Sequence, residues 1–156
     1  HKLQNGIRMI IKKATIDDMK DIIAMARAFH QESAARKYTL TEERIKELTA
    51  LILSTGLGIL AVKDGEPIGM MAAMLQKNVF FDELMAGDYL IYVKPEHRGT
   101  EAAQLMVDYY IHWAKSYGAK CIGIDIESGI NDERALNFYN KMGFKTTGYH
   151  MKLEEM

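Results

Sequence analysis

A strand–helix–strand pattern in the second half of the chain constrains the fold most strongly. A β-rich run at 89–93 ends at Lys94-Pro95, an amphipathic stretch covers about residues 100–117, and an apolar run follows at 121–126. Apolar residues three and four apart predict that the middle stretch is a helix, and Gly118 is a typical residue for its end. Two strands joined through such a helix lie parallel in one sheet, with a right-handed crossover. The chain therefore has a sheet that is at least partly parallel.

The first third of the chain predicts one strand and two helices. A short strand at 9–13 precedes a helix that is capped by Thr15. A second helix begins near Thr39, which forms a capping box with Glu42. This helix ends at Gly56, where the next strand opens.

Further strands extend the predicted sheet. Asp64-Gly65 is typical of a tight hairpin turn between two short strands. The order β-α-α-β-β-β-α-β-α-β predicts an α/β fold, in detail an α+β mixed sheet with an antiparallel meander, one parallel crossover and helices on both faces. The remaining predicted segments are strands at 59–63, 67–75 and 145–153, a loop at 76–87 and a helix at 131–142.

Length and charge limit the classes of protein to consider. The 156 residues suit one domain, for which we expect residues 9–156, with residues 1–8 as a leader that is either vector-derived or disordered. A net charge of -1 gives no global attraction to nucleic acid or to an anionic membrane. No apolar run reaches the roughly 18 residues that span a bilayer. The single cysteine, Cys121, cannot form an internal disulfide, which agrees with a reducing compartment, so we expect a cytoplasmic protein.

The segment 93–103 carries the strongest functional signal. It joins a predicted strand to the start of a helix, where free backbone N–H groups and the helix dipole favour an anion. Small residues at Gly99, Ala102 and Ala103 let a ligand approach the backbone, and Arg98 adds positive charge. The alternative is an ordinary turn with solvated charges.

Two motifs in this chain together resemble those of the GNAT N-acetyltransferases. The junction resembles the family signature Arg/Gln-x-x-Gly-x-Gly/Ala preceded by Val-x-Pro-Glu-x. The downstream motif has Asn, then Ala four residues later, then Phe-Tyr-x-Lys-x-Gly-Phe. The matching residues are Val93, Pro95, Glu96, Arg98, Gly99 and Ala103 in the first motif, and Asn131, Ala135, Phe138, Tyr139, Lys141, Gly143 and Phe144 in the second. The resemblance covers nearly the whole chain and most resembles phage-associated branches of the family.

One residue departs from the family pattern. Glu101 occupies the position of the family's central glycine. A carboxylate at ~6 Å from a phosphate, at an effective dielectric constant of ~20, would cost roughly 3 kcal/mol. Either the Glu101 side chain points into solvent, which its place in a first helical turn favours, or donor affinity is reduced.

The resemblance implies an acyl transfer that uses acetyl-CoA as co-substrate and no metal. The amine of the acceptor attacks the thioester carbonyl directly, and the pantetheine arm runs in an opening between the strands at 89–93 and 121–126. Tyr139 matches the tyrosine that donates a proton to the leaving sulfur, although packing against Phe138 also explains it. Asn131 matches a donor-contacting residue and is equally good as a helix cap. The expected donor-binding residues are Ile91, Tyr92, Val93, Arg98, Gly99, Thr100, Glu101, Ala102, Ala103, Asn131, Phe138 and Tyr139.

The catalytic base and the acceptor site are less constrained by sequence. The resemblance implies a glutamate on the strand before the junction, but the nearest carboxylate there is Asp88. Asp125 lies on the neighbouring predicted strand, and strand alternation leaves the face of either carboxylate open. His30 and Glu32 follow the first helix, where the resemblance places the acceptor, and a solvated loop is the alternative. Methionines at 70, 71 and 74 fit either an adaptable acceptor pocket or the core.

Two functions therefore remain open. The first is an N-acetyltransferase acting on a small-molecule amine or a protein amine, without nucleic-acid or membrane partners. The second is a GNAT-like module that binds CoA, or nothing, without catalysis. Edge strands allow pairing between copies, so a homodimer is also considered.

Overall fold

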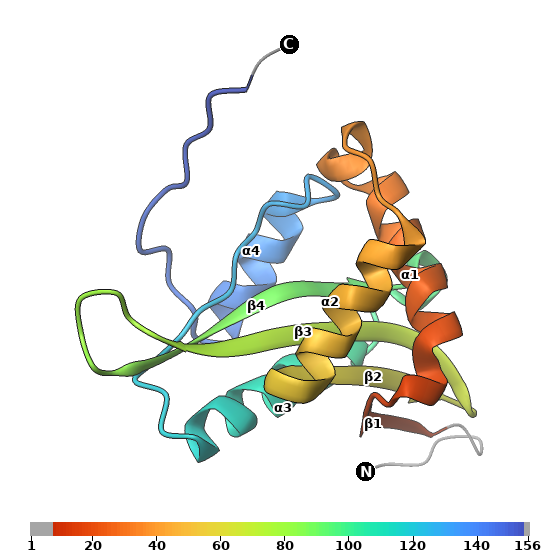
Figure 1. Ribbon diagram of the computed structural model, residues 1–156, viewed down its shortest axis with the longest axis horizontal. Coiled ribbons are helices and arrows are strands. Elements are labelled where there is room, and N and C mark those ends of the chain that lie inside the picture. Colours follow the sequence, from red (N-terminus) through yellow and green to blue (C-terminus); the bar gives the residue numbers. More distant parts are fainter. Residues whose placement is uncertain (1–7, 155–156) are drawn as a thin grey trace.

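The computed structural model describes residues 8–154, which form one central sheet. The expected leader, apart from its last residue, lies outside the described residues. The sheet has five strands in the order β1-β2-β3-β4-β5 (Figure 1). Neighbouring strands pair antiparallel except β4 and β5, which pair parallel, so the predicted meander and parallel crossover are confirmed. The strands are β1 (Met9–Lys13), β2 (Leu57–Lys63), β3 (Glu66–Lys77), β4 (Leu84–Val93) and β5 (Cys121–Ile122).

Helices cover both faces of the sheet, because its strands present apolar residues to both sides (Figure 1). Ile59 and Leu60 are neighbours on β2 that point to opposite faces, and both are fully buried. On one face, α1 (Met19–Glu32) and α2 (Glu42–Thr55) pack against Leu60. On the other face, α3 (Ala102–Ser116) packs against Ile59. No helix among residues 8–154 has the length and apolar character to cross a membrane.

Local capping agrees with the sequence at the first helix and differs at the second. Thr15 forms a capping box with Asp18 through a short 3-10 helix, Ile16–Asp18, that leads into α1. The predicted cap at Thr39 is wrong: the cap of α2 is Thr41, whose hydroxyl accepts a hydrogen bond from the Arg44 amide at 3.2 Å. A further 3-10 helix, Ala34–Lys37, lies between α1 and α2.

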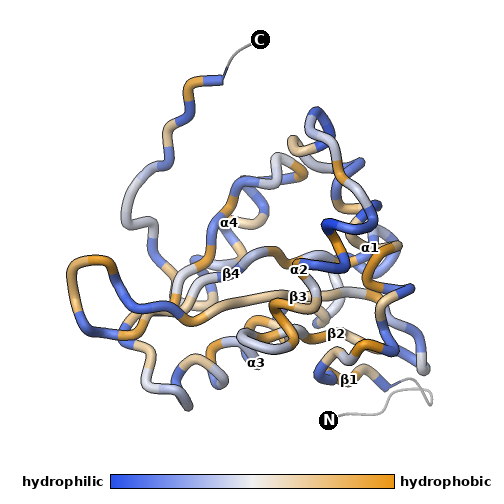
Figure 2. Tube along the Cα trace, viewed as in Figure 1, coloured by the Kyte–Doolittle hydropathy of each residue, from blue (hydrophilic) through white to orange (hydrophobic). Residues whose placement is uncertain are grey.

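The β3–β4 hairpin is longer than the sequence predicts. Lys77 pairs with Leu84, so the connecting loop shrinks from the predicted 76–87 to 78–83. The side chain of Asn78 accepts hydrogen bonds from the amides of Phe80 and Phe81, at 2.8 and 3.2 Å, and so forms the turn without glycine or proline. The apolar loop tip projects from the sheet (Figure 2).

The carboxyl-terminal part differs most from the prediction. The strand predicted at 121–126 is paired only at Cys121–Ile122, and the helix α4 (Asp132–Lys141) follows. The strand predicted at 145–153 is not formed, and the chain after α4 runs away from the sheet (Figure 1). Its ion pairs, Lys152 with Glu127 and Glu154 with Lys37, join side chains and supply no backbone ladder.

Candidate functional site

The β4–α3 junction leaves several backbone N–H groups without a partner. The 3-10 helix Pro95–His97 follows β4, and Gly99 has φ +84°, a conformation that glycine adopts easily. The amide of Ala102 contacts the Thr100 hydroxyl at 3.4 Å. Among residues 8–154, no acceptor is found for the amides of Gly99, Thr100, Glu101, Ala103 and Gln104. Such a cluster at the start of a fifteen-residue helix can bind an anion.

The side chain of Arg98 contacts the protein instead of pointing out of this junction. Its Nε donates to the carbonyl of Val93 at 2.9 Å, and its two terminal nitrogens lie 3.0 and 3.2 Å from the carboxylate of Glu32. The guanidinium also lies over the ring of Tyr92, at 5.5 Å from its centroid. Arg98 therefore ties the junction to the end of α1.

The charge pair changes the pKa values of its partners. The hydrogen bond from Arg98 lowers the pKa of Glu32, and burial opposes this only in part. Burial, and then the hydrogen bond from Tyr92 to Glu32 at 2.6 Å, raise the pKa of Tyr92 to about 12. Glu32 is therefore a carboxylate, and Tyr92 a neutral phenol, at neutral pH.

Glu101 lies at the amino-terminal cap of α3. Its side chain is exposed, and within the described chain it forms no ion pair or cap hydrogen bond. Of the two alternatives left by the sequence, this placement agrees with a carboxylate that points into solvent.

Within the described residues, the edge of β4 that faces away from β3 is open beyond its first residues. The Lys94 amide donates to the Ile68 carbonyl at 2.9 Å. In an antiparallel ladder alternate residues bond to the same neighbour, so Tyr92 also bonds to β3, whereas Ile91 and Val93 face the other edge. On that edge β5 reaches only Met85 and Ala86. The structure thus brings the predicted backbone groups of Ile91 and Val93 to an open edge, and turns those of Tyr92 away from it.

Asp88 lies where β4 and the chain after β5 separate. The amide of Gly123 still donates to the Ala86 carbonyl, at 2.9 Å, and two residues later the amide of Asp125 donates to the Asp88 carboxylate, at 3.0 Å. Burial raises the pKa of Asp88 to about 6; the Asp125 amide opposes this shift, and the charges of Asp125 and Glu127 add to it. Asp88 is therefore a carboxylate that can exchange a proton near neutral pH.

Helix α4 brings a second positive group to the junction. A Cβ added to Gly99 would lie 3.7 Å from a guanidinium nitrogen of Arg134. The side chain of Asn131 caps α4 by accepting from the Arg134 amide, at 3.2 Å, so its capping role is confirmed. An open pocket along α4 is lined by Asn131, Glu133, Arg134, Asn137, Phe138 and Lys141.

Arg134 was missed by the sequence analysis. The sequence placed it three residues after Asn131, on the same helix as the recognised motif, which is the signal that could have found it. Its approach to Gly99 depends on how α4 packs, which the helical period alone does not give.

Tyr139 is buried on the inner side of α4. Its ring packs against those of Phe138 and Phe144, with centroids 5.1 and 5.9 Å away. Burial, with the charge of Asp88 as a smaller contribution, raises the pKa of Tyr139. The phenol therefore keeps its proton over the physiological pH range and can donate a hydrogen bond. Both the packing and the proton-donor interpretations fit this position.

The two residues predicted to meet an acceptor, His30 and Glu32, each contact a different part of the protein. Glu32 is paired with Arg98 and Tyr92, as described above. A ring nitrogen of His30 lies 2.7 Å from the carbonyl of Tyr38 and so helps to close the loop between α1 and α2.

Comparison with solved structures shows which fold this is. No curated protein sequence matches the chain. A transcriptional regulator from Bacillus halodurans C-125 is similar with a TM-score of 0.78 and 20% identity, over 95% of this chain and 100% of that one. The aminoglycoside antibiotic 6'-N-acetyltransferase AAC(6')-IG from Acinetobacter haemolyticus gives 0.74 and 18%, over 94% and 98%. AAC(6')-Iy in complex with the bisubstrate analog CoA-S-monomethyl-acetylneamine gives 0.77 and 14%, over 96% and 99%.

These similarities place the chain in the structural class that includes the N-acetyltransferases, with a mixed sheet that opens beside β4. The profile of the Acetyltransferase (GNAT) family matches residues 16–144, which is most of the chain. The chain belongs to the GNAT acetyltransferase family. The resemblance of the two sequence motifs and the predicted fold class are thereby confirmed.

Proposed function

We propose that this protein is an N-acetyltransferase that moves an acetyl group from acetyl-CoA to a primary amine. The observation that carries the proposal is the cluster of free amides at the β4–α3 junction, next to an open strand edge. The amide cluster suits a diphosphate, and the open strand edge suits an extended arm that contains amide groups. Family membership and the CoA analogue bound by a protein of the same fold support CoA as the donor.

The donor is held mainly by backbone groups in this proposal. The free amides of Gly99, Thr100, Glu101 and Ala103 bind the diphosphate, assisted by the dipole of α3. Arg134 adds the side-chain charge, and Arg98 holds the loop in shape. The backbone of Ile91 and Val93 bonds to the pantetheine arm along the open edge.

The transfer itself requires one bond to form and one to break. The neutral amine attacks the thioester carbon, the carbon–sulfur bond then breaks, and the sulfur leaves as a thiolate. An amine with a pKa of about 10.4 is only about 0.04% neutral at pH 7, equivalent to roughly 4.6 kcal/mol. We assign Asp88 as the group that accepts the proton from the attacking nitrogen, because it lies at the opening with a pKa of about 6.

Tyr139 supplies a proton to the leaving sulfur in this scheme. Its phenol is protonated and lies close enough to Asp88 for that charge to raise its pKa. The proton accepted by Asp88 and the one donated by Tyr139 balance, because exchange with water returns both groups to their starting states.

The second candidate is a module that binds CoA without catalysis. Glu101 favours it, because a carboxylate stands beside the amides where the family pattern has glycine. It is also favoured by the lack of a glutamate on β4.

Titration calorimetry and a thiol-release assay distinguish the two functions. Acetyl-CoA should bind, and at least one member of a panel of primary amines should release free CoA thiol above the rate of hydrolysis. Binding without release for every amine supports the binding module. Absence of heat at millimolar acetyl-CoA would exclude the acetyltransferase and the CoA-binding module, and would leave a GNAT-like module that binds no CoA.

A further inference from the structure

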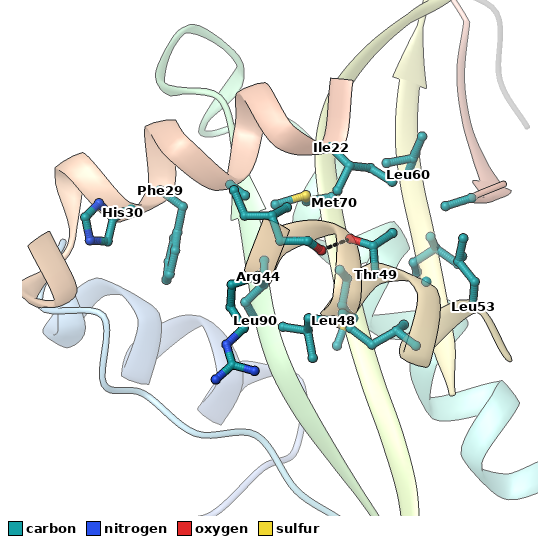
Figure 3. A pocket seen from close by; sticks show the side chains of 18 of the residues that line it. Ile22, Phe29, His30, Arg44, Leu48, Thr49, Leu53, Leu60, Met70 and Leu90 are labelled. Carbon is teal, nitrogen blue, oxygen red and sulfur yellow. Dashed lines mark hydrogen bonds between the residues drawn. The ribbon is translucent and has the colours of Figure 1, made fainter. Parts of the chain in front are cut away.

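A cavity lies between the two helices on one face and the sheet beneath them. It has a volume of about 240 Å³ and lies between α1, α2 and the middle strands (Figure 3). It is distinct from the junction and from the open edge of β4, and no step described above uses it. Its wall is built of apolar side chains, among them Ile22, Phe29, Leu48, Leu60, Met70 and Leu90.

The few polar side chains in the wall already have partners. The hydroxyl of Thr49 donates to the carbonyl of Ile45 at 2.7 Å (Figure 3). His30 contacts the Tyr38 carbonyl at 2.7 Å, and Arg44 pairs with Glu47 at 3.4 Å. An ordered water needs two to four polar partners, and cavities lined by apolar groups stay dry. The cavity is therefore suited to bind an apolar group.

No carboxylate of the described residues lines the wall. A ligand with several ammonium groups would bring charges into this space without a counterion, and burying unpaired charges is strongly unfavourable. A polyamine sugar therefore does not suit the cavity, whereas an aromatic or branched aliphatic group does.

The cavity is close to the strand proposed to bind the donor. Leu90 belongs to both the wall and β4, and it is next to Ile91, whose backbone faces the open edge. At the far end from Leu53, His30 and Arg44 line the cavity (Figure 3), and the Arg44 side chain is 74% exposed, so this end reaches the surface.

From this arrangement we infer that the cavity holds the apolar body of the acceptor, a small amine with an aromatic or branched aliphatic group. The inference rests on the proposed acetyl transfer. An apolar cavity of ~150 Å³ accommodates benzene, so this one accommodates about ten non-hydrogen atoms by the same ratio. Met70, which is flexible, lets the wall adapt to related shapes.

Binding of 2-phenylethylamine to the full chain tests the site. Calorimetry is done with and without CoA, with glucosamine as the polar comparison. Ala26→Leu fills the cavity from α1, and Leu48→Phe fills it from α2. The matched control is Ala24→Leu, the same change on the exposed side of α1. We expect each filling variant to weaken 2-phenylethylamine binding at least tenfold, and the control to change it less than twofold.

The outcomes separate the cavity from the proposed reaction. Undetectable binding to the wild type overturns the inference, as does equal binding to a filling variant that circular dichroism shows to be folded. Thiol release from acetyl-CoA is measured in parallel. Cavity-dependent binding without release for any amine contradicts the acetyl transfer and leaves an apolar binding site. Release with glucosamine but no binding of 2-phenylethylamine supports the transfer and overturns the apolar acceptor.

Discussion

The guanidinium of Arg98 connects three parts of the molecule that are distant in sequence. It contacts the carbonyl at the end of β4, the carboxylate at the end of α1 and the ring of Tyr92. A motif residue that the resemblance assigns to the donor is thus placed as a support for the loop with the free amides. In the proposed function, Arg98 therefore affects donor binding through the shape of the junction.

Replacement of Arg98 by alanine tests this supporting role. We expect weaker acetyl-CoA binding, by about tenfold, with a smaller change in the turnover of bound donor, because the amide cluster loses its brace. Stability should fall by about 1 kcal/mol, since the pair is partly exposed and solvent screens it. Calorimetry and urea unfolding measure both effects. Arg27→Ala, which removes an exposed arginine on α1 outside the cavity and the junction, is the control. A loss of turnover without weaker acetyl-CoA binding would contradict the supporting role of Arg98.

Asp88 makes stability depend on pH in a predictable direction. Its pKa is about 6 in the folded chain and 3.8 in its ordinary state. The folded form therefore binds the proton more tightly, and its stability falls as pH rises from about 4 to 6. We expect Asp88→Asn to remove this fall and to gain about 2 kcal/mol relative to wild type between pH 4 and pH 7. Urea unfolding across this range measures it, with the exposed Asp108→Asn as control. Parallel curves for wild type and Asp88→Asn would contradict the assignment.

A substitution at Tyr139 can distinguish proton donation from packing. The change to phenylalanine keeps the contacts with Phe138 and Phe144 and removes only the hydroxyl. We expect turnover to fall by about a hundredfold or more, with little change in acetyl-CoA affinity. Initial rates of thiol release with a reactive amine, together with calorimetry, give the two numbers. Unchanged turnover would leave Tyr139 as a core residue.

At the scale of the elements, the sequence predicted those that are defined by local pattern. The helix at the crossover, the Asp64-Gly65 turn and the cap at Asn131 each depend on residues within one or two turns. The end of β5 depends instead on where the chain after it separates from β4, and the β3–β4 loop depends on the side chain of Asn78. Those contacts are set by packing and by side-chain geometry, which the periodic spacing of apolar residues does not predict.

The candidate site also has parts that the sequence predicts and parts that it does not. The amide cluster follows from a strand that passes into a helix, so the sequence located it. The approach of Arg134 to Gly99 joins two elements about 35 residues apart, and the pair between Glu32 and Arg98 joins two about 66 apart. No motif spacing reports such contacts, and the apolar cavity under α2 requires the helices to be placed in three dimensions.

We expect the charge of Glu101, at the start of α3, to affect CoA binding. Glu101 is exposed next to the free amides, so its solvated carboxylate would repel the diphosphate of the proposed donor only weakly. At ~6 Å in water the repulsion is about 0.7 kcal/mol. We therefore expect Glu101→Gln to tighten CoA binding about threefold at low salt, and the gain to disappear near 1 M salt, where screening is within ~3 Å. Calorimetry at two salt concentrations measures it, with Glu43→Gln on α2 as control. A gain that persists at high salt would contradict an electrostatic cause.

At the scale of the whole molecule, the sheet ends at a short strand, and the chain after α4 runs away from it. Beyond α4, alternate apolar residues point into solvent: Tyr149 is 93%, Met151 89% and Leu153 102% exposed. Alternation of this kind is the pattern of a strand with one buried face, which is why the sequence predicted one. A strand forms only where another strand supplies backbone partners, and within the described chain none is adjacent to this segment.

The stability of the monomer should therefore be nearly independent of these three side chains. We expect Tyr149→Ser, Met151→Ser and Leu153→Ser together to change the free energy of unfolding by less than about 1 kcal/mol, because exposed substitutions typically change it within ±0.5 kcal/mol each. Urea unfolding measures this, and Ile59→Ala in the sheet core is the contrasting variant, with an expected loss of about 2–5 kcal/mol. Sedimentation of wild type and triple variant at several concentrations completes the test. If the triple variant loses several kcal/mol, or dissociates an assembly that the wild type forms, the segment is covered in solution. A second copy that pairs with it, as in a homodimer, then becomes the structure to determine.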